Sequence, residues 1–393
     1  MASSVLDELL QTNFDQHQVL RNESKFHSHT VHHLGALSLL GISDEQLRNI
    51  YEKSMRRYDD KYEPSPHEIT KDNWRNSIGD KRFCTAYRNF FNGELPIEGD
   101  WKKKFFEYLL DDTNGTALIF TSLDSLIHPI IHIGYAILLN SRIVACEALT
   151  MAAACVHSYY QTPTNLKPPM NGKKSPLQII KDIRRDDHVP SLTEPFQISL
   201  VLKDDESVIL EHYNEWKIPE DCVKAIEELF DMAVYIYAAT HKSDQIDFDF
   251  VLLHLLTGMN AIRNLRSYLD NNSIQRLLRS FFYLSITIYI AQRRPKINEH
   301  LLHDYKIDEN KCNWEYIVDH TLHTKLATEP HAVKVIYSLK EAEKDYGSKN
   351  KLYLKAAMKS VEHLRTDTPY NYYKSHEPWI GMSDANRELN IKD

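Results

Sequence analysis

Hydrophobic residues recur along most of the chain at intervals of three or four positions, the spacing that lines one face of an α-helix. This pattern predicts a protein built mainly of helices. In the middle of residues 247–269 the apolar side chains cover almost the whole circumference, which predicts a central, buried helix. The expected helices span residues 29–40, 44–59, 101–112, 124–158, 219–241, 247–269, 273–291, 313–327, 329–346 and 349–365.

Two kinds of segment depart from this pattern. The only strand candidates are "FQISLVL" at 196–202 and "SVIL" at 207–210, too few for a large sheet. Residues 161–196 hold six of the 15 prolines and many charges, which favours an irregular loop or lid, with a domain linker as the alternative. The predicted fold class is mostly α, a single large helical-bundle domain over 1–365 with this proline-rich excursion, followed by a polar tail at 366–393.

The composition excludes several classes of protein. The 393 residues carry a formal net charge of −8 with scattered lysine and arginine, whereas a nucleic-acid-binding protein would show a basic patch. The five cysteines are far apart and form no CxxC pair, which indicates reduced thiols. The N-terminus lacks a secretory pattern, and the most apolar run, residues 125–139, is too short to span a membrane. A cytoplasmic protein without membrane or nucleic-acid partners is therefore expected.

Nucleotide-binding motifs are also missing. No GxGxxG sequence is present, so the chain has no dinucleotide-binding fingerprint. The stretch "NGKKS" at 171–175 looks like the end of a phosphate-binding loop, but Lys167 stands where such a loop requires glycine. The sequence therefore predicts no nucleotide site.

Several of the 20 histidines lie in apolar helical segments, where an imidazole needs a hydrogen-bond partner. A single buried histidine is usually satisfied by a backbone carbonyl or a tyrosine. Several that point into one helical core can instead be satisfied together by a metal ion, and helical bundles commonly build metal sites in this way. The candidate side chains on these segments are His29, His32, His33, His128, His132, Tyr135, His254, His331 and Lys334.

The segment "EPHAVKVIYSL" raises a question of charge. His331 and Lys334 are three residues apart and share one helix face, close to apolar residues that favour burial. A buried lysine is costly while it keeps its proton. Either Lys334 reaches the surface and pairs with Glu329 or Glu341, or it is not an ordinary lysine.

An ordered set of motifs resembles the questin oxidase-like family. The motifs run along nearly the whole chain and are "FHSHTVHHLGALSLLGIS", "NWRNSIGDKRFCTAYRNFF", "HPIIHIGYAI", "EALTMAAA", "DFDFVLLHLLTGMNAIRNL", "YIAQRRPKI" and "EPHAVKVIYSLKEAEK". The resemblance implies an iron-dependent oxygenase with a mostly helical fold. It also implies that dioxygen is the co-substrate in an oxidative ring cleavage, formally of Baeyer–Villiger type, of a small anthraquinone or related aromatic polyketide of secondary metabolism.

The resemblance further implies a metal centre of four histidines and a carboxylated lysine. Carried over motif by motif, the ligands to Fe(II) are His29, His128, His254, His331 and Lys334. The family pattern has an asparagine before the first ligand, whereas this chain has Ser28. His132 and Tyr135 are then expected beside the substrate as catalytic groups, and His32 and His33 as neighbours of the ligands.

A carboxylated lysine would answer the question of charge. Carbon dioxide adds to a neutral amine, so Lys334 must first lose its proton, which an apolar pocket promotes. The resulting carbamate is an anion with oxygen donors that a metal would hold. NADPH is associated with the family, but without a binding motif we expect it to serve a partner, the substrate or the iron.

Two other functional hypotheses use the same residues. A helical metal-dependent hydrolase would use these ligands to activate water, although no His-Asp doublet lies in a buried helix. A non-catalytic helical scaffold would use the histidines only for packing and would bind no metal. The sequence makes no prediction of oligomeric state.

Overall fold

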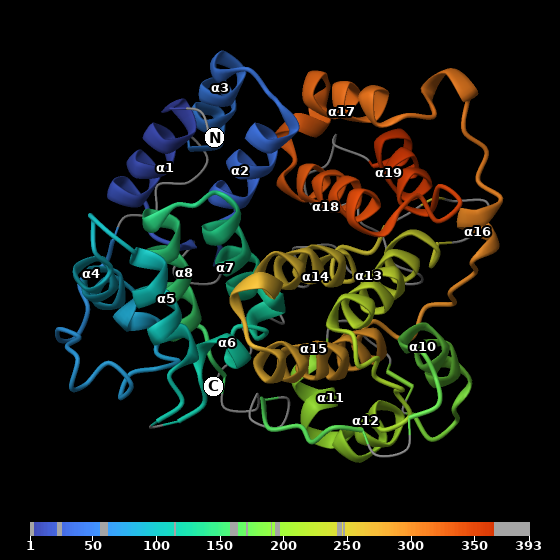
Figure 1. Ribbon diagram of the computed structural model, residues 1–393, viewed down its shortest axis with the longest axis horizontal. Helices are drawn as coiled ribbons and strands as arrows, with labels where there is room; N and C mark the ends of the chain where they lie inside the picture. The colour runs from blue at the N-terminus through green and yellow to red at the C-terminus, as the bar shows by residue number, and fades with distance from the viewer. Residues whose placement is uncertain are drawn as a thin grey trace. The chain divides into compact units, whose positions relative to one another are not determined.

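Helices dominate the computed structural model, which describes residues 4–21, 26–55, 62–113, 115–157, 164–169, 172–189, 191–192, 197–241, 246 and 248–364 (Figure 1). The predicted fold class, mostly α, is confirmed. Within these residues the regular strands are β1 (Leu20–Arg21) and β2 (Phe26–His27), an antiparallel pair in which Leu20 lies opposite His27. The expected tail at 366–393 lies outside the described residues.

The chain divides into two compact units. The first unit comprises Met1–Thr164 and Ala261–Leu269. In it, α8 packs against both α7 and α4. Its helices, apart from the end of α14, are α1 (Ser4–Gln16), α2 (Thr30–Leu40), α3 (Asp44–Met55), η1 (Lys81–Phe83), α4 (Cys84–Glu94), α5 (Trp101–Leu110), α6 (Leu118–Thr121), η2 (Ser125–Ile127), α7 (His128–Leu138), α8 (Arg142–Ala154) and η4 (Arg266–Tyr268).

The second unit comprises Asn165–Asn260 and Asp270–Asp393. In it, α18 packs against α19, and α13 packs against α10 and α15. Its helices are α10 (Pro176–Arg185), α11 (Ile198–Asp204), α12 (Glu206–Tyr213), α13 (Cys222–Ala238), α14 (Leu253–Leu265), α15 (Asn271–Ala291), α16 (His300–His303), η5 (Glu309–Lys311), α17 (Trp314–His323), η6 (Lys325–Thr328), α18 (Pro330–Tyr346) and α19 (Leu352–His363). The last residues of α14 belong to the first unit.

The long helix expected over 124–158 is instead three elements, η2, α7 and α8. Asn140 adopts a left-handed conformation with φ 50°, which an α-helix does not accept. Ser141 then caps α8 by accepting a hydrogen bond from the backbone N–H of Val144. The break allows α8 to fold back against α7, so one apolar stretch supplies two packed helices.

Both strand candidates are helical where the structure describes them. Residues 198–204 form α11 and residues 206–213 form α12, and both helices pack against α15. The runs of Ile, Val and Leu that suggested strands supply buried contacts, among them Val201 and Ile209. Packing against α15 therefore overrides the β preference of these short segments.

The proline-rich segment 161–196 is not irregular throughout its described part, because it contains α10. Ser175 and Gln178 form a reciprocal capping box at the start of this helix, and Pro176 occupies its first turn. Ile179, Ile180 and Ile183 are buried. A proline at a helix start is favourable, so proline content alone overstated the irregularity.

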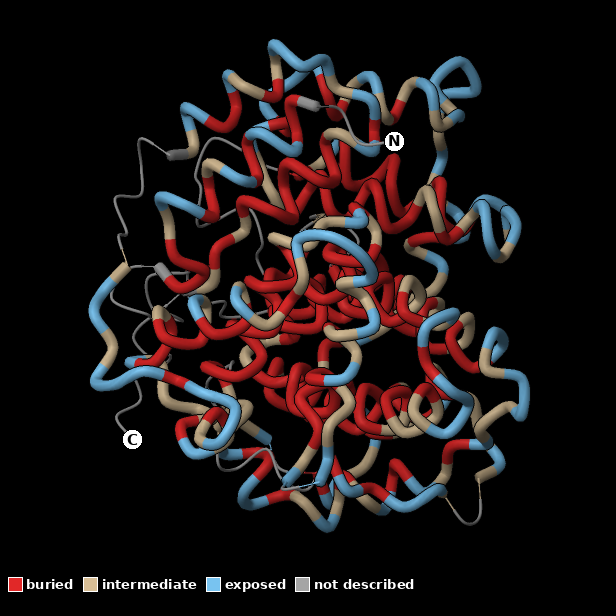
Figure 2. Tube along the Cα trace, turned by 60° about the vertical axis from the view of Figure 1, so that its left-hand side comes forward, coloured by how far each residue is buried: buried red, intermediate tan, exposed pale blue. Residues whose placement is uncertain are grey.

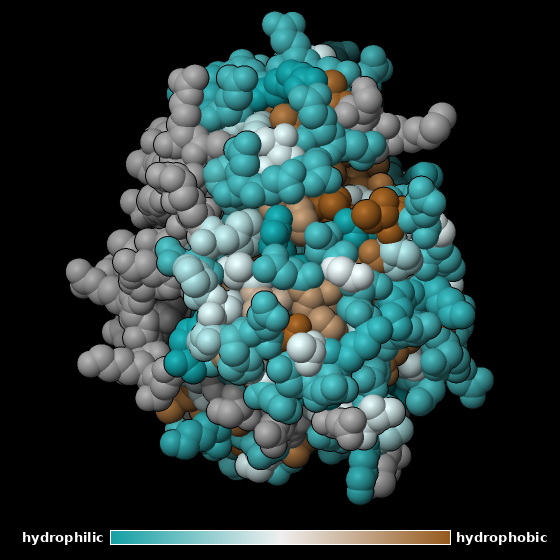
Figure 3. All heavy atoms as spheres, turned by 90° about the vertical axis from the view of Figure 1, so that its left-hand side faces the viewer, coloured by the Kyte–Doolittle hydropathy of each residue, from teal (hydrophilic) through white to brown (hydrophobic). Residues whose placement is uncertain are grey.

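Buried residues form long runs within the helices, and exposed residues gather at turns and loops (Figure 2). On the face that Figure 3 shows, hydrophilic side chains predominate among the described residues and hydrophobic ones form small patches. Across the described part of the chain, the apolar helices are too short or too interrupted by charge for any to cross a membrane.

Helices α7 and α14 come into backbone contact within the first unit, at Gly134 and Ala261. A Cβ atom added to Gly134 would lie 2.6 Å from the Cβ of Ala261 and 2.7 Å from its Cα. We expect Gly134→Ala to lower the free energy of unfolding by about 1–3 kcal/mol, because the helices must move apart. Gly93→Ala is the matched control, since nothing lies within 4 Å of its added Cβ. Denaturant unfolding of both variants measures the difference, and equal stabilities would contradict the close contact.

Candidate functional site

The start of α7 is held in an unusual backbone conformation. Ser125, Leu126 and Ile127 have φ values of 54°, 51° and 67°, all left-handed and none a glycine. Left-handed backbone costs about 1–2 kcal/mol for an ordinary residue, and such strain often accompanies a functional site. Its local effect is to bring the carbonyl oxygen of Ser125 to 2.9 Å from Nδ1 of His128, the first residue of α7.

His128 faces His29, the residue that precedes α2, and their Nε2 atoms lie 3.1 Å apart. Because Nδ1 of His128 donates to Ser125, its Nε2 carries the lone pair. Two nitrogens bound to one ion at about 2.1 Å each, at nearly a right angle, have this separation. His27 stacks on His128 with ring centroids 4.6 Å apart. Burial and the neighbouring histidines lower the pKa of His27 well below its usual range, so this ring adds no charge.

A second pair of histidines connects to a buried carboxylate. His32 Nε2 lies 3.1 Å from His132 Nδ1, and His132 Nε2 lies 3.3 Å from Glu147 Oε2 on α8. Glu147 is 1% exposed and also accepts a hydrogen bond from Asn13. With Glu147 ionised, His132 donates from Nε2 and accepts at Nδ1, so His32 donates from Nε2 and keeps its lone pair on Nδ1.

Tyr135 packs beside this network. Its ring stacks on His32 with centroids 5.3 Å apart and planes 24° apart. The close approach of α2 requires a residue without a side chain, because a Cβ on Gly35 would lie 3.0 Å from the Tyr135 ring. His32 also contacts His29 edge to face, with centroids 5.9 Å apart, so the network adjoins the His29–His128 pair.

The second unit contributes another group. His254 on α14 and His331 on α18 lie with ring centroids 5.3 Å apart, and Phe250 packs against both. His254 Nδ1 lies 2.9 Å from the carbonyl oxygen of Phe250, and His331 Nδ1 lies 2.8 Å from Oε1 of Glu329. Glu329 also accepts from the backbone N–H of His331 and so caps α18.

Three of the four predicted histidine ligands are oriented in the same way. In His128, His254 and His331, Nδ1 is directed at an acceptor oxygen, so the ring presents the Nε2 lone pair. Histidines that ligate metals are typically held like this, with the other ring nitrogen donating to a carbonyl or a carboxylate.

Lys334 lies one turn after His331 and is 1% exposed. Burial lowers the pKa of its ammonium to about 7, and the carboxylate of Glu329 acts in the opposite direction. Its Nζ has no hydrogen-bond partner among the described residues. The alternative of a surface ion pair with Glu329 or Glu341 is therefore wrong. The amine is neutral in a substantial fraction of molecules near pH 7, and the neutral form is the one that reacts with carbon dioxide.

The histidines at the start of α2 take part in two different contact pairs. His29 contacts His128, whereas His32 pairs with His132. His33 is buried, and its backbone N–H donates to the carbonyl oxygen of His29. Sequence reasoning missed Glu147, although a single carboxylate in the apolar stretch "RIVACEALTMAAA" was a signal for it.

Comparison with known proteins adds independent information. A family model described as Questin oxidase-like matches residues 26–339. The oxidoreductase AflY of Aspergillus parasiticus is 24% identical over 361 residues, which cover 83% of this chain and 71% of the relative. A Baeyer–Villiger oxidase of Pestalotiopsis microspora is 20% identical over an aligned region that covers 86% of this chain and 81% of the relative. A questin oxidase of Aspergillus terreus is 23% identical over a region that covers 39% of this chain and 35% of the relative.

Proposed function

Because the chain belongs to the questin oxidase-like family, we propose that it is an iron-dependent oxygenase that cleaves a ring of an anthraquinone or a related polycyclic aromatic ketone. The family and the relatives establish an oxidoreductase. The metal, the substrate and the Baeyer–Villiger type of cleavage are our proposal. The names of the relatives support the substrate class and the type of cleavage, and the proposed ligand residues support the metal.

The proposed ligands are His29, His128, His254, His331 and Lys334. His29, His128 and His254 form a group in which each residue offers one ring nitrogen that could hold a metal ion. The shared ring orientation supports the choice of Nε2 in three of the histidines.

The observation that carries the proposal is the buried amine of Lys334 beside His331. A buried amine with a pKa near 7 and no described partner is unfavourable in a protein core. The four neutral imidazoles supply no anionic oxygen to the proposed centre, and Lys334 as a carbamate would supply one. Imidazole nitrogen together with a hard anionic oxygen suits iron.

A bound Fe(II) would supply the electrons that activate dioxygen. The remaining chemistry falls to the protein. The contacts of Nδ1 with Ser125, Phe250 and Glu329 hold three rings in fixed tautomers. Phe250, packed against His254 and His331, excludes water from their side of the centre.

The connected residues Glu147, His132 and His32 form a route for a proton. Glu147 holds a proton on Nε2 of His132, and the linked tautomers leave Nδ1 of His32 able to accept one. We propose that this route removes or returns the proton of a phenolic substrate. Tyr135, stacked on His32, fixes the position of that ring.

Glu147→Gln tests the proton route. The amide keeps the shape of the carboxylate but can no longer stabilise a protonated His132. We expect kcat to fall about 10²–10⁴-fold, the usual contribution of a positioned acid or base, while the iron content stays that of the wild type. Iron analysis and steady-state kinetics of the same preparation measure both. A variant that loses iron and activity in parallel would show that Glu147 only supports the ligands.

Isotopic labelling tests the function itself. The purified, iron-loaded protein is incubated with questin and a panel of hydroxylated anthraquinones under ¹⁸O₂, with and without NADPH as the reductant, and in parallel in H₂¹⁸O under ordinary dioxygen, and the products are analysed by mass spectrometry. We expect one or two ¹⁸O atoms in a ring-opened product, a count that also distinguishes monooxygenase from dioxygenase chemistry. Label taken only from H₂¹⁸O, without oxygen consumption, would indicate the hydrolase instead.

A further inference from the structure

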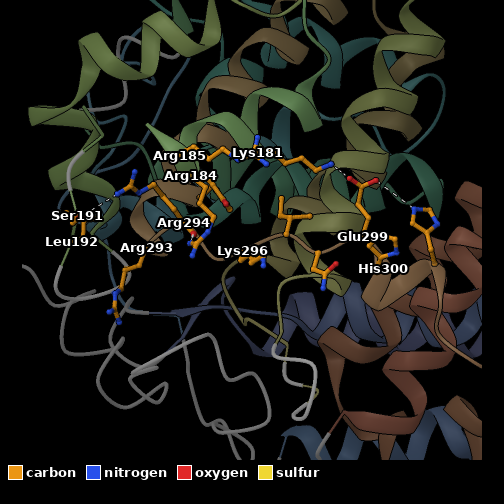
Figure 4. Close-up of a pocket in the computed structure, with 14 residues that line it drawn as sticks. Lys181, Arg184, Arg185, Ser191, Leu192, Arg293, Arg294, Lys296, Glu299 and His300 are labelled. Atoms are coloured by element: carbon orange, nitrogen blue, oxygen red, sulfur yellow. Dashed lines mark hydrogen bonds and ion pairs between the residues drawn. The ribbon is translucent and has the colours of Figure 1, made fainter. Parts of the chain in front are cut away.

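A basic pocket lies within the second unit, apart from the residues discussed so far (Figure 4). Its volume is about 790 Å³, within the range of about 300–1,000 Å³ typical of small-molecule sites. It is formed by α10, the segment that follows α15, and α16. Its basic lining residues are Lys181, Arg184, Arg185, Arg293, Arg294 and Lys296.

The charge of this pocket is opposite to that of the whole chain, which carries −8. The lining contains one carboxylate, Glu299, which forms an ion pair with Lys181 at one end of the group (Figure 4). Lys181 and Arg185 are four residues apart on one face of α10, where like charges destabilise a helix by about 0.2–0.5 kcal/mol. Burial lowers the pKa of the Lys181 ammonium, and the positive charge of Arg185 lowers it further. A bound anion would relieve this repulsion.

The two central arginines are held in place by backbone carbonyls. Arg294 donates to the carbonyl oxygens of Ile183 and Asp186, at 3.1 and 2.9 Å, and to the hydroxyl of Ser191. Arg184 donates in return to the carbonyl oxygen of Arg294. These contacts fix both guanidinium groups before any ligand arrives, which reduces the entropy lost on binding.

Arginine occupies positions directly after α15 where glycine would be less strained. Arg293 and Arg294 have φ values of 65° and 52°. The N–H of Arg293 bonds to Ile290 and that of Arg294 to Tyr289, which is the Schellman arrangement at a helix end. Glycine usually occupies the left-handed position of this motif. Arg293 at that position, followed by Arg294 in a second left-handed conformation, points to a use for their side chains.

From these observations we propose that the pocket binds a ligand with two or more linked phosphate groups. A planar guanidinium recognises phosphate oxygens through paired hydrogen bonds, and several cations around one cavity suit an anion with multiple charges. A single phosphate would leave most of this charge uncompensated. The pocket is independent of the proposed iron centre, so its ligand can be tested whether or not that centre exists.

Equilibrium dialysis of the purified full chain against radiolabelled pyrophosphate tests the proposal, with ADP and orthophosphate in parallel. We expect one pyrophosphate per chain, bound at least about tenfold more tightly than orthophosphate. Tighter binding of ADP would identify a nucleotide as the source of the phosphates, and equal or weaker binding would identify a free polyphosphate. Iron content measured before and after dialysis detects any chelation of the metal.

The double variant Arg185→Gln/Lys296→Gln removes two charges from the pocket without disturbing the arginines that bind backbone. We expect it to weaken pyrophosphate binding at least about tenfold. The matched control, Lys203→Gln/Lys224→Gln, removes two exposed lysines outside the pocket and should bind as the wild type does. Absence of binding to the wild type, equal loss in both double variants, or orthophosphate binding as tight as pyrophosphate would overturn the proposal.

Discussion

Replacing Lys334 with methionine is expected to abolish iron binding and oxygenase activity together. Methionine fills a similar volume but cannot form a carbamate, so the centre loses its only anionic ligand. Purified Lys334→Met should contain less than about a tenth of the iron in the wild type, since loss of even a supporting contact typically weakens metal binding 10–100-fold. Metal analysis and oxygen consumption on the same sample give both values.

Lys359→Met is the matched control for this change. Burial also lowers the pKa of Lys359 to about 7, but its Nζ donates to the carbonyl oxygens of Ala238 and Leu301. We expect this variant to lose stability and keep its iron. In metal-free protein, Lys334→Met should instead raise the free energy of unfolding by about 1–3 kcal/mol, because it removes an unsatisfied buried amine. If Lys334→Met retained a full complement of iron, the carbamate would be excluded.

His128→Ala is expected to have the next largest effect. It removes a proposed ligand together with the Nε2 atom that lies 3.1 Å from His29. We expect iron affinity to fall at least about 100-fold and kcat per chain to fall in proportion to the iron lost. The strained residues before it should remain, because Asp124 still accepts from the backbone N–H of Ser125.

His212→Ala is the control for the loss of a buried imidazole. His212 Nε2 lies 2.9 Å from Asp186, in the second unit and outside the proposed centre. We expect this variant to unfold more easily and to bind iron as the wild type does. Equal iron content in the two alanine variants would favour the scaffold reading, in which the histidines serve only for packing.

Local sequence patterns predicted elements whose ends are set by neighbouring residues. The helix expected at 329–346 is α18 (Pro330–Tyr346). Its start is local in origin, because Glu329 caps the helix and Pro330 occupies its first position. The break at Asn140 and the helices α11 and α12 were not predicted. The break depends on the left-handed conformation of Asn140 and on the packing of α8 against α7, and α11 and α12 depend on packing against the distant α15; a periodic pattern encodes neither.

The same distinction applies to the candidate site. Spacing alone placed His331 and Lys334 on one face, and the unusual character of Lys334 followed from its apolar neighbours. The contact of His132 with Glu147 was not predictable in this way, because it arises only when α8 folds back on α7. The tautomers of His128 and His254 likewise depend on backbone carbonyls that no side-chain pattern reveals.

A crystal structure of the aerobically prepared protein, with anomalous diffraction measured at the iron absorption edge, tests the central claim most directly. We predict one anomalous peak per chain, bonded to Nε2 of His29, His128, His254 and His331. Density for a carboxyl group on the Lys334 amine should extend to the same peak. A map without an iron peak at these histidines, or with an unmodified Lys334 remote from the ion, would contradict the account.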